Sequence, residues 1–219
     1  MIKNIIFDFD GVLVDSEILA RKAFSRYLIE KNINLTENDF SRNYSGNKLT
    51  EVIVLLSKRF NIKNQDIFFQ EIMELAQKIY KEELTTVKGV KSFLEKIDCN
   101  KLIGSNRGKK SIIEGLMKVN LMNFFDNSNI FSFDMVSKPK PDPDVYLKAI
   151  EVSKIKNDET IIIEDSMIGV KAGVEANIKV IGITAGGHWE GRSPNLLLKS
   201  GAYAVARTFE EVIYIINKL

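Results

Sequence analysis

Short apolar runs alternate with longer amphipathic segments along most of the chain. The apolar runs occupy residues 3–9, 101–105, 129–135, 160–164, 178–183 and 202–206. Short runs without polar alternation are typical of strands that are buried on both faces of a parallel sheet. Helical patterns lie between most of them, at residues 109–119, 143–153, 167–176 and 208–218. This alternation predicts an α/β fold with a doubly wound, Rossmann-like parallel sheet.

One region breaks the alternation and shows helical patterns only. Apolar residues recur at helical spacing within 16–31, 49–60 and 68–84, and Thr36 followed by Asp39 is a partial helix-start signal. A block of helices after the first strand predicts an all-helical cap domain inserted into the sheet domain. We therefore expect residues 1–15 and 87–219 to form the core and residues 16–86 to form the cap. Asp15 is expected to cap the first cap helix.

Composition narrows the class of protein. The chain has 219 residues, is 45% apolar and 27% charged, and has a net charge of +2, an ordinary balance for a globular protein. No run of Lys and Arg residues is long enough to suggest that the protein binds nucleic acid. No apolar stretch approaches the roughly 20 residues of a membrane span, and the N-terminal run is too short and broken for a signal peptide. The single cysteine, Cys99, fits a reducing compartment. We expect a cytoplasmic protein, with a monomer as the default.

Polar residues gather where the predicted strands end. They are Asp8 and Asp10 after the first strand, Ser105 and Asn106 at the end of the second, Lys138 after the third, and Glu164 and Asp165 at the end of the fourth. The carboxyl ends of parallel strands meet at one edge of a sheet, where open α/β folds bind their ligands. Four separate segments are therefore expected to line one pocket.

The charges of this predicted pocket indicate its ligands. Clustered carboxylates repel one another unless a cation compensates them. Oxygen ligands suit a hard ion, and Mg²⁺ is the expected cofactor. A lysine and a hydroxyl beside such an ion can bind an anion, for which a phosphate group is the natural candidate.

Four stretches of the sequence resemble the ordered signature motifs of the haloacid dehalogenase superfamily. They read DFDGVLVDS, LIGSN, SKPKPDP and IEDSMIGVKAG, and the similarity extends over residues 5–187. They look like the large phosphatase branch of that superfamily, which has a helical cap inserted after the first strand. This resemblance implies a phosphoric monoester hydrolase.

The resemblance also implies roles for the two aspartates of the first motif. Asp8 is expected to be the nucleophile that becomes an aspartyl-phosphate, and Asp10 to be the general acid and base. Both would be metal ligands, Asp10 through its backbone carbonyl. Gly11 would let the backbone approach the phosphoryl group.

The remaining motifs supply the other expected site residues. Ser105 and Asn106 would bind phosphate oxygens. In KPKPDP the matching lysine is taken as Lys138 rather than Lys140, and it would hold the nucleophile and offset phosphate charge. Asp165 would be a metal ligand, and Glu164 either a ligand or a partner of one.

The cap is expected to select the substrate. The segment YSGNKLTEVI, Tyr44–Ile53, resembles the cap loop of sugar-phosphate members, particularly 6-phosphogluconate phosphatase-like proteins. Lys48 in that loop and Glu17 after the hinge are the candidate substrate contacts. TAGGHW, which holds His188 and Trp189, resembles a loop of the same branch, and we interpret it as a packed or surface loop rather than a site.

The preferred function is a Mg²⁺-dependent phosphatase of a small phosphorylated metabolite, a sugar or sugar-acid phosphate. One alternative is a phosphosugar mutase similar to β-phosphoglucomutase. Such mutases have a histidine where this chain has Ala20 and an arginine near the position of Lys48, so both positions count against it. A non-catalytic phospho-ligand binder is the other alternative, and the complete set of motif residues counts against it.

Overall fold

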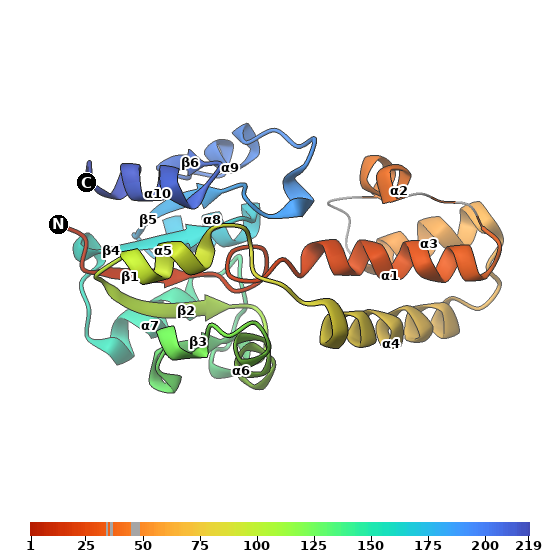
Figure 1. Cartoon of the computed structure of the whole chain (residues 1–219), viewed down its shortest axis with the longest axis horizontal. Helices are drawn as coiled ribbons and strands as arrows, with labels where there is room; N and C mark the ends of the chain where they lie inside the picture. Colours follow the sequence, from red (N-terminus) through yellow and green to blue (C-terminus); the bar gives the residue numbers. More distant parts are fainter. Residues whose placement is uncertain (34, 36, 45–48) are drawn as a thin grey trace. The chain divides into compact units, whose positions relative to one another are not determined.

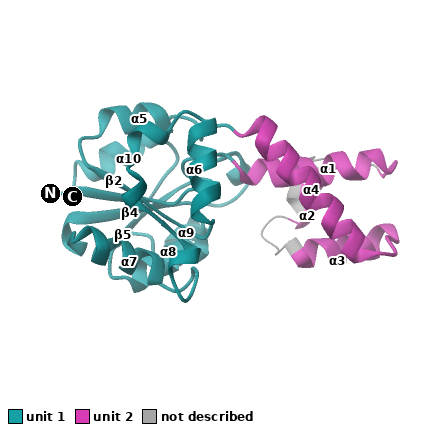
Figure 2. Ribbon diagram, turned by 90° about the horizontal axis from the view of Figure 1, so that it is seen from below, with its two compact units in different colours: residues 1–15, 85–219 teal, residues 16–84 magenta. Residues whose placement is uncertain are grey.

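The computed structural model describes residues 1–33, 35, 37–44 and 49–219. The chain divides into two compact units, one made of Met1–Asp15 with Thr85–Leu219 and the other of Ser16–Leu84. Figure 2 colours the two units separately. Thr36 and Lys48, two residues singled out above, lie outside the described residues.

The larger unit is built on a six-stranded sheet with the strand order β3-β2-β1-β4-β5-β6. All neighbouring strands are parallel. The strands are β1 (Asn4–Phe7), β2 (Asn100–Ser105), β3 (Ile130–Ser132), β4 (Thr160–Glu164), β5 (Lys179–Ile183) and β6 (Ala204–Ala206). β1 lies between β2 and β4, and Phe7 is in register with both Ile103 and Ile163. The predicted doubly wound α/β fold is confirmed.

Helices cover both faces of the sheet (Figure 1). One face carries α5 (Val90–Lys96) and α10 (Phe209–Ile216), where Phe93 contacts both Phe7 and Phe209. The other face packs on α7 (Asp144–Ser153), α8 (Met167–Glu175) and α9 (Asn195–Lys199). α6 (Lys109–Lys118) contacts the edge strand β3. Alternate residues of β1 thus enter two separate hydrophobic layers, which explains the uninterrupted apolar run.

Three details of this unit differ from the sequence-based expectation. The helices α5 and α9 were not predicted, because each has few residues and too short a pattern to show a period. Residues 133–135 form a 3-10 turn instead of continuing the third strand, which ends at Ser132. β3 is an edge strand that pairs with β2 alone, over three residues. No second neighbouring strand in the described part of the chain supplies the hydrogen bonds that would extend it.

The regular elements of the smaller unit are all helices in the part of it that the structure describes. It contains α1 (Glu17–Glu30), α2 (Glu37–Tyr44), α3 (Leu49–Phe60) and α4 (Gln65–Glu83). Its own apolar core includes Phe24, Leu28, Leu56, Phe68 and Ile72. α4 begins after Asn64, whose side chain accepts a hydrogen bond from the Ile67 N–H, as a capping residue does.

The chain leaves and re-enters the sheet unit at one place. Val14 and Thr86 form an antiparallel bridge. The Asp15 N–H donates to the Thr85 carbonyl at 3.0 Å, and the Val87 N–H donates to the Leu13 carbonyl at 3.2 Å. The two connecting segments therefore run side by side. Within the described part of the chain, no helix combines the length and the apolar character needed to cross a bilayer.

Candidate active site

Three carboxylates meet at the carboxyl ends of two adjacent strands. Asp8 directly follows β1, and its N–H continues the ladder by donating to the Ile163 carbonyl at 3.0 Å. Glu164 ends β4, and Asp165 follows it. Each of the three side chains is buried, and each offers one oxygen within 4.8 Å of the oxygens of the other two. The sheet topology thus brings these predicted site residues together.

The lysine that reaches these carboxylates is Lys140. Its Nζ donates to Asp8 Oδ1 and to Glu164 Oε1, each at 2.7 Å, and its side chain is 2% exposed. The assignment to Lys138 is corrected by this geometry. The Lys138 side chain is 68% exposed and its Nζ lies 3.4 Å from Asp142 Oδ1. The two lysines stand in equivalent Lys-Pro dipeptides, so the sequence does not separate them, whereas burial does.

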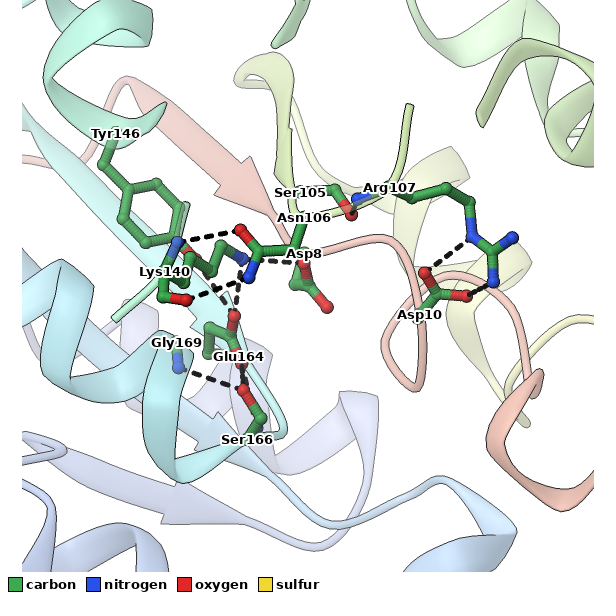
Figure 3. A network of polar contacts seen from close by, with 10 residues as sticks. All are labelled: Asp8, Asp10, Ser105, Asn106, Arg107, Lys140, Tyr146, Glu164, Ser166 and Gly169. Atoms are coloured by element: carbon green, nitrogen blue, oxygen red, sulfur yellow. Dashed lines mark hydrogen bonds and ion pairs between the residues drawn. The ribbon is translucent and has the colours of Figure 1, made fainter. Parts of the chain in front are cut away.

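Asn106 holds the backbone of Lys140 from both sides. Asn106 Oδ1 accepts from the Lys140 N–H at 2.8 Å, and Asn106 Nδ2 donates to the Lys140 carbonyl at 3.1 Å. These two bonds join the end of β2 to the proline-rich loop and aim the lysine at Asp8 (Figure 3). The Asn106 amide, predicted to bind phosphate, is therefore engaged with the chain itself.

Both oxygens of Glu164 are also engaged. Oε1 accepts from Lys140 Nζ at 2.7 Å and from the Tyr146 hydroxyl at 3.1 Å, while Oε2 accepts from the N–H and hydroxyl of Ser166 at 2.9 Å each. A Cβ on Gly169 would lie 1.7 Å from Oε1, so only glycine leaves room for this carboxylate against α8. Because both of its oxygens already accept hydrogen bonds, Glu164 is better suited to hold Lys140 than to bind a metal ion directly.

The buried charges affect one another's ionisation. Burial raises the pKa of the Asp8 carboxyl well above its usual range, and the ammonium of Lys140 opposes that rise. The nearby carboxylates of Glu164 and Asp165 raise the same pKa further. Burial also disfavours the charged form of Lys140, yet Asp8 and Glu164 hold the pKa of Lys140 well above its usual range. Lys140 therefore stays protonated, while Asp8 has an excess of negative charge around it.

The donor set fits a hard divalent cation. Asp8 and Asp165 present carboxylate oxygens, the ligand type that such ions prefer, in a buried site that also contains Glu164. Burial, and then repulsion from the neighbouring carboxylates, raises the pKa of Asp8, and a cation there would offset the repulsion. Lys140 already neutralises one side of Asp8 through Oδ1.

Asp10 lies apart from the buried cluster and pairs with Arg107 (Figure 3). Arg107 donates from Nε to Asp10 Oδ2 and from Nη2 to Asp10 Oδ1, both at 2.7 Å. The Arg107 N–H in turn donates to Ser105 Oγ at 3.1 Å. Arg107 is not among the site residues that the sequence predicts. Its position directly after Ser105 and Asn106, at the same strand end, is the signal that could have found it.

The loop after β5 contacts the site through His188. His188 Nε2 lies 2.9 Å from Asp165 Oδ2, and the side chain is 10% exposed. The loop is packed, as interpreted, but it is packed against a site carboxylate. Asp15, expected to cap a helix, accepts instead from the Gly187 N–H at 3.2 Å, and Ser16 stands at the start of α1.

The other predicted residues have these places. Gly11 has a positive φ of 78°, and a Cβ there would lie 1.8 Å from Asp165 Oδ2, so a side chain would displace that carboxylate. Ser105 is buried at the end of β2. Glu17 is exposed and is the first residue of α1.

Known proteins resemble this chain over most of its length. The profile of the haloacid dehalogenase-like hydrolase family matches residues 5–183. The 6-phosphogluconate phosphatase of Escherichia coli K12 is 24% identical over 192 residues, with 85% of each chain covered. A phosphorylated carbohydrates phosphatase of Thermotoga maritima is 28% identical over 219 residues, with 98% of each chain covered.

A solved structure resembles the whole chain. It is a conserved haloacid dehalogenase-like protein of unknown function from Agrobacterium tumefaciens, with a TM-score of 0.87 and 26% identity over 100% of this chain and 99% of that one. The match to the family profile covers most of the sequence and includes each strand that carries a site carboxylate. The chain therefore belongs to the haloacid dehalogenase-like hydrolases, as the four motifs predicted.

Proposed function

We propose that this protein is a Mg²⁺-dependent phosphatase that hydrolyses a small phosphorylated metabolite, a sugar or sugar-acid phosphate, through an aspartyl-phosphate on Asp8. The observation that carries the proposal is the contact of the buried Lys140 ammonium with Asp8 Oδ1 at 2.7 Å, beside two further carboxylates. A nucleophilic carboxylate can approach a phosphate anion only if cations offset their repulsion. Lys140 supplies one such charge.

The two aspartates divide the chemistry in this proposal. An Asp8 oxygen attacks phosphorus, the bond from phosphorus to the ester oxygen breaks, and Asp10 gives its proton to the leaving alkoxide. Asp10 then takes a proton from a water molecule, which attacks phosphorus. The acyl-phosphate bond breaks, inorganic phosphate leaves and Asp8 is regenerated. The Ser105 hydroxyl binds a phosphate oxygen during both steps.

The metal site is assigned to Asp8, Asp165 and the backbone carbonyl of Asp10. When bound, Mg²⁺ would supply positive charge for the phosphate oxygens and for the crowded carboxylates. Glu164 keeps Lys140 in place through their contact at 2.7 Å. Lys140 takes the phosphate-neutralising role that the motif first suggested for Lys138.

The substrate class rests on the relatives and on the helical unit. Two similar proteins are named as phosphatases of 6-phosphogluconate and of phosphorylated carbohydrates. We assign substrate selection to the cap, residues 16–86, with Glu17 and Lys48 as candidate contacts. An inserted unit of this kind can exclude water and complete a pocket when substrate binds.

The proposal is tested by phosphate release from p-nitrophenyl phosphate and from a panel of sugar, sugar-acid and polyol phosphates. We expect hydrolysis with Mg²⁺, loss of activity with EDTA and recovery when Mg²⁺ is restored. Asp8→Asn should lower kcat by at least about 10⁴-fold, because the nucleophile is removed. Full activity of Asp8→Asn would overturn the assignment.

The same panel separates the alternatives. β-Glucose 1-phosphate with a bisphosphate primer would give the 6-phosphate without free phosphate if the protein were a mutase. Tight binding of phosphate esters with no turnover would indicate a phospho-ligand binder. Ranking the substrates by kcat/KM identifies the class that the cap selects.

A further inference from the structure

The loop Thr184–Trp189 makes polar contacts with Asp15 and with Asp165, and we call it the clasp loop. It contains the only histidine and the only tryptophan of the chain. The Gly187 N–H donates to the Asp15 carboxylate at 3.2 Å, and Trp189 Nε1 donates to the backbone carbonyl of Asp165 at 3.1 Å. His188 Nε2 lies 2.9 Å from Asp165 Oδ2. Trp189 thus holds the backbone of Asp165, and the preceding residue, His188, holds its side chain.

Two glycines leave the room that the imidazole occupies. A Cβ on Gly186 would lie 2.9 Å from His188 Cε1 and Nδ1, and a Cβ on Gly11 would lie 3.0 Å from His188 Cε1. The same Cβ on Gly11 would lie 1.8 Å from Asp165 Oδ2. The ring and the carboxylate oxygen therefore fit together in a space that any side chain at Gly11 would fill.

Trp189, like His188, is held in place by its surroundings. It is 5% exposed, and the guanidinium of Arg192 lies 4.6 Å from the centre of its ring. The indole N–H contact with the Asp165 carbonyl gives the clasp loop a second attachment that does not involve the carboxylate. The loop is thus held in place independently of His188, and His188 is presented to Asp165 by a fixed support.

An isolated packing role would not require a nitrogen at this position. A leucine-sized apolar side chain would fill similar space, whereas Nε2 lies at hydrogen-bonding distance from a carboxylate that belongs to the proposed metal site. Groups that hydrogen-bond a metal ligand fix its orientation, and their loss typically weakens metal binding by about 10–100-fold.

We infer that His188 is a positioning residue that holds Asp165 Oδ2 and so directs the other carboxylate oxygen, Oδ1, toward a bound divalent cation. The inference rests on the proposed function, because it takes Asp165 as a metal ligand. It assigns a role to a residue outside the four sequence motifs. His188 acts through Asp165 and touches neither the phosphate nor the reacting atoms in this assignment.

The test is direct binding of Mn²⁺ to the full chain, measured from the electron paramagnetic resonance signal of the free ion, with no substrate present. His188→Leu removes the donor and keeps most of the volume, while His188→Gln keeps an amide donor that can reach Asp165. Glu190→Gln is the matched control, because this exposed residue directly follows the clasp loop. Fluorescence of Trp189, the only tryptophan, gives a second readout next to Asp165.

We expect His188→Leu to bind Mn²⁺ about 10–100-fold more weakly than the wild type. His188→Gln should recover most of this loss, and Glu190→Gln should bind as the wild type does. In assays, the Mg²⁺ concentration for half-maximal activity should rise for His188→Leu, while kcat at saturating Mg²⁺ changes much less. Thermal unfolding shows which variants are folded. If His188→Leu does not fold, His188→Asn, whose amide is too short to reach Asp165, serves as the loss variant with the same expectation.

Two results would overturn the inference while leaving the proposed function intact. One is wild-type Mn²⁺ affinity in the variant that lacks the donor. The other is an equal loss in His188→Leu and His188→Gln, which would mean that ring packing alone matters. Absence of saturable Mn²⁺ binding in the wild type would overturn the metal-dependent function itself, together with this inference.

Discussion

Asp8 and Asp10 stand one residue apart at the end of the same strand, yet their surroundings differ in burial and in the kind of partner. Asp8 belongs to a buried cluster with Lys140, Tyr146 and Glu164, in which the lysine side chain is 2% exposed. Asp10 forms a two-bonded pair with Arg107, and the side chains are 23% and 31% exposed. Figure 3 shows the two groups on separate sides of the strand end.

This difference matches the separate tasks proposed for the two carboxylates. Charges in the buried cluster cannot rely on water, so each depends on a fixed partner, and removing one leaves the others unpaired. The pair of Asp10 and Arg107 is partly open to solvent, where an ion pair contributes little to stability and water can replace a partner. A nucleophile needs a fixed position, whereas a proton carrier must exchange protons with the leaving group and with water.

The largest effect is expected in the buried cluster. Lys140→Met removes the positive charge beside Asp8 and Glu164, so kcat/KM should fall by about 10³-fold, as when a key oxyanion donor is lost. Lys138→Met is the matched control two residues away, and its kcat/KM should stay within about twofold of the wild type. Phosphate release and circular dichroism are measured for both variants. A greater loss in Lys138→Met would return the phosphate role to that residue.

A smaller effect is expected at the open pair. Arg107→Gln removes the two bonds that orient Asp10 and leaves the carboxylate in contact with water. We expect kcat to fall by about tenfold, a fraction of what general acid and base catalysis contributes. Steady-state kinetics on p-nitrophenyl phosphate measures the change. A loss as large as that of Lys140→Met would show that the two groups depend on fixed partners equally.

The smallest effect is on stability, and it has the opposite sign. Because the folded-state pKa of Asp8 is raised, ionising Asp8 costs folding free energy at neutral pH. Asp8→Asn should therefore raise Tm in metal-free buffer at pH 7, by about 2–4 °C for each 1 kcal/mol gained in a chain of this size. The gain should disappear as the pH falls below about 4, where the carboxyl is protonated in both states.

Calorimetry with and without Mg²⁺ provides the control for that prediction. The ion should stabilise the wild type more than Asp8→Asn, since it offsets the charge that the variant lacks. A lower Tm for Asp8→Asn in metal-free buffer would mean that the contact of Asp8 with Lys140 outweighs the cost of burial. The buried cluster would then be stabilising as a whole.

The fold could be predicted from the sequence because its signals are local. Each strand that carries a site residue is a short apolar run bounded by polar side chains, and α3 begins and ends at the predicted residues, Leu49–Phe60. Short elements such as α9 escaped prediction because five residues show no period. Parallel pairing of β1 with β2 and β4 then places Asp8 beside Glu164 without further information.

The errors at the site have a different physical origin. Lys138 and Lys140 have the same neighbours in sequence, and only the bonds from Asn106, 34 residues away, decide which of them enters the site. Arg107 contacts Asp10, 97 positions earlier in the chain, and His188 contacts Asp165 from a different loop. The pairing in each case arises from tertiary packing, and only the position of Arg107 at a strand end is visible in the sequence.

The paired connections at Val14 and Thr86 have a consequence for how this family can vary. The two chain segments that lead into and out of residues 16–84 are bridged to each other, so the inserted unit begins and ends at adjacent positions of the sheet unit. Insertions tolerate exchange best where their ends are adjacent and the host remains closed without them. Under the proposed function, we expect that exchange of the helical unit would change the substrate preference of a chimera and leave the phosphate chemistry unchanged.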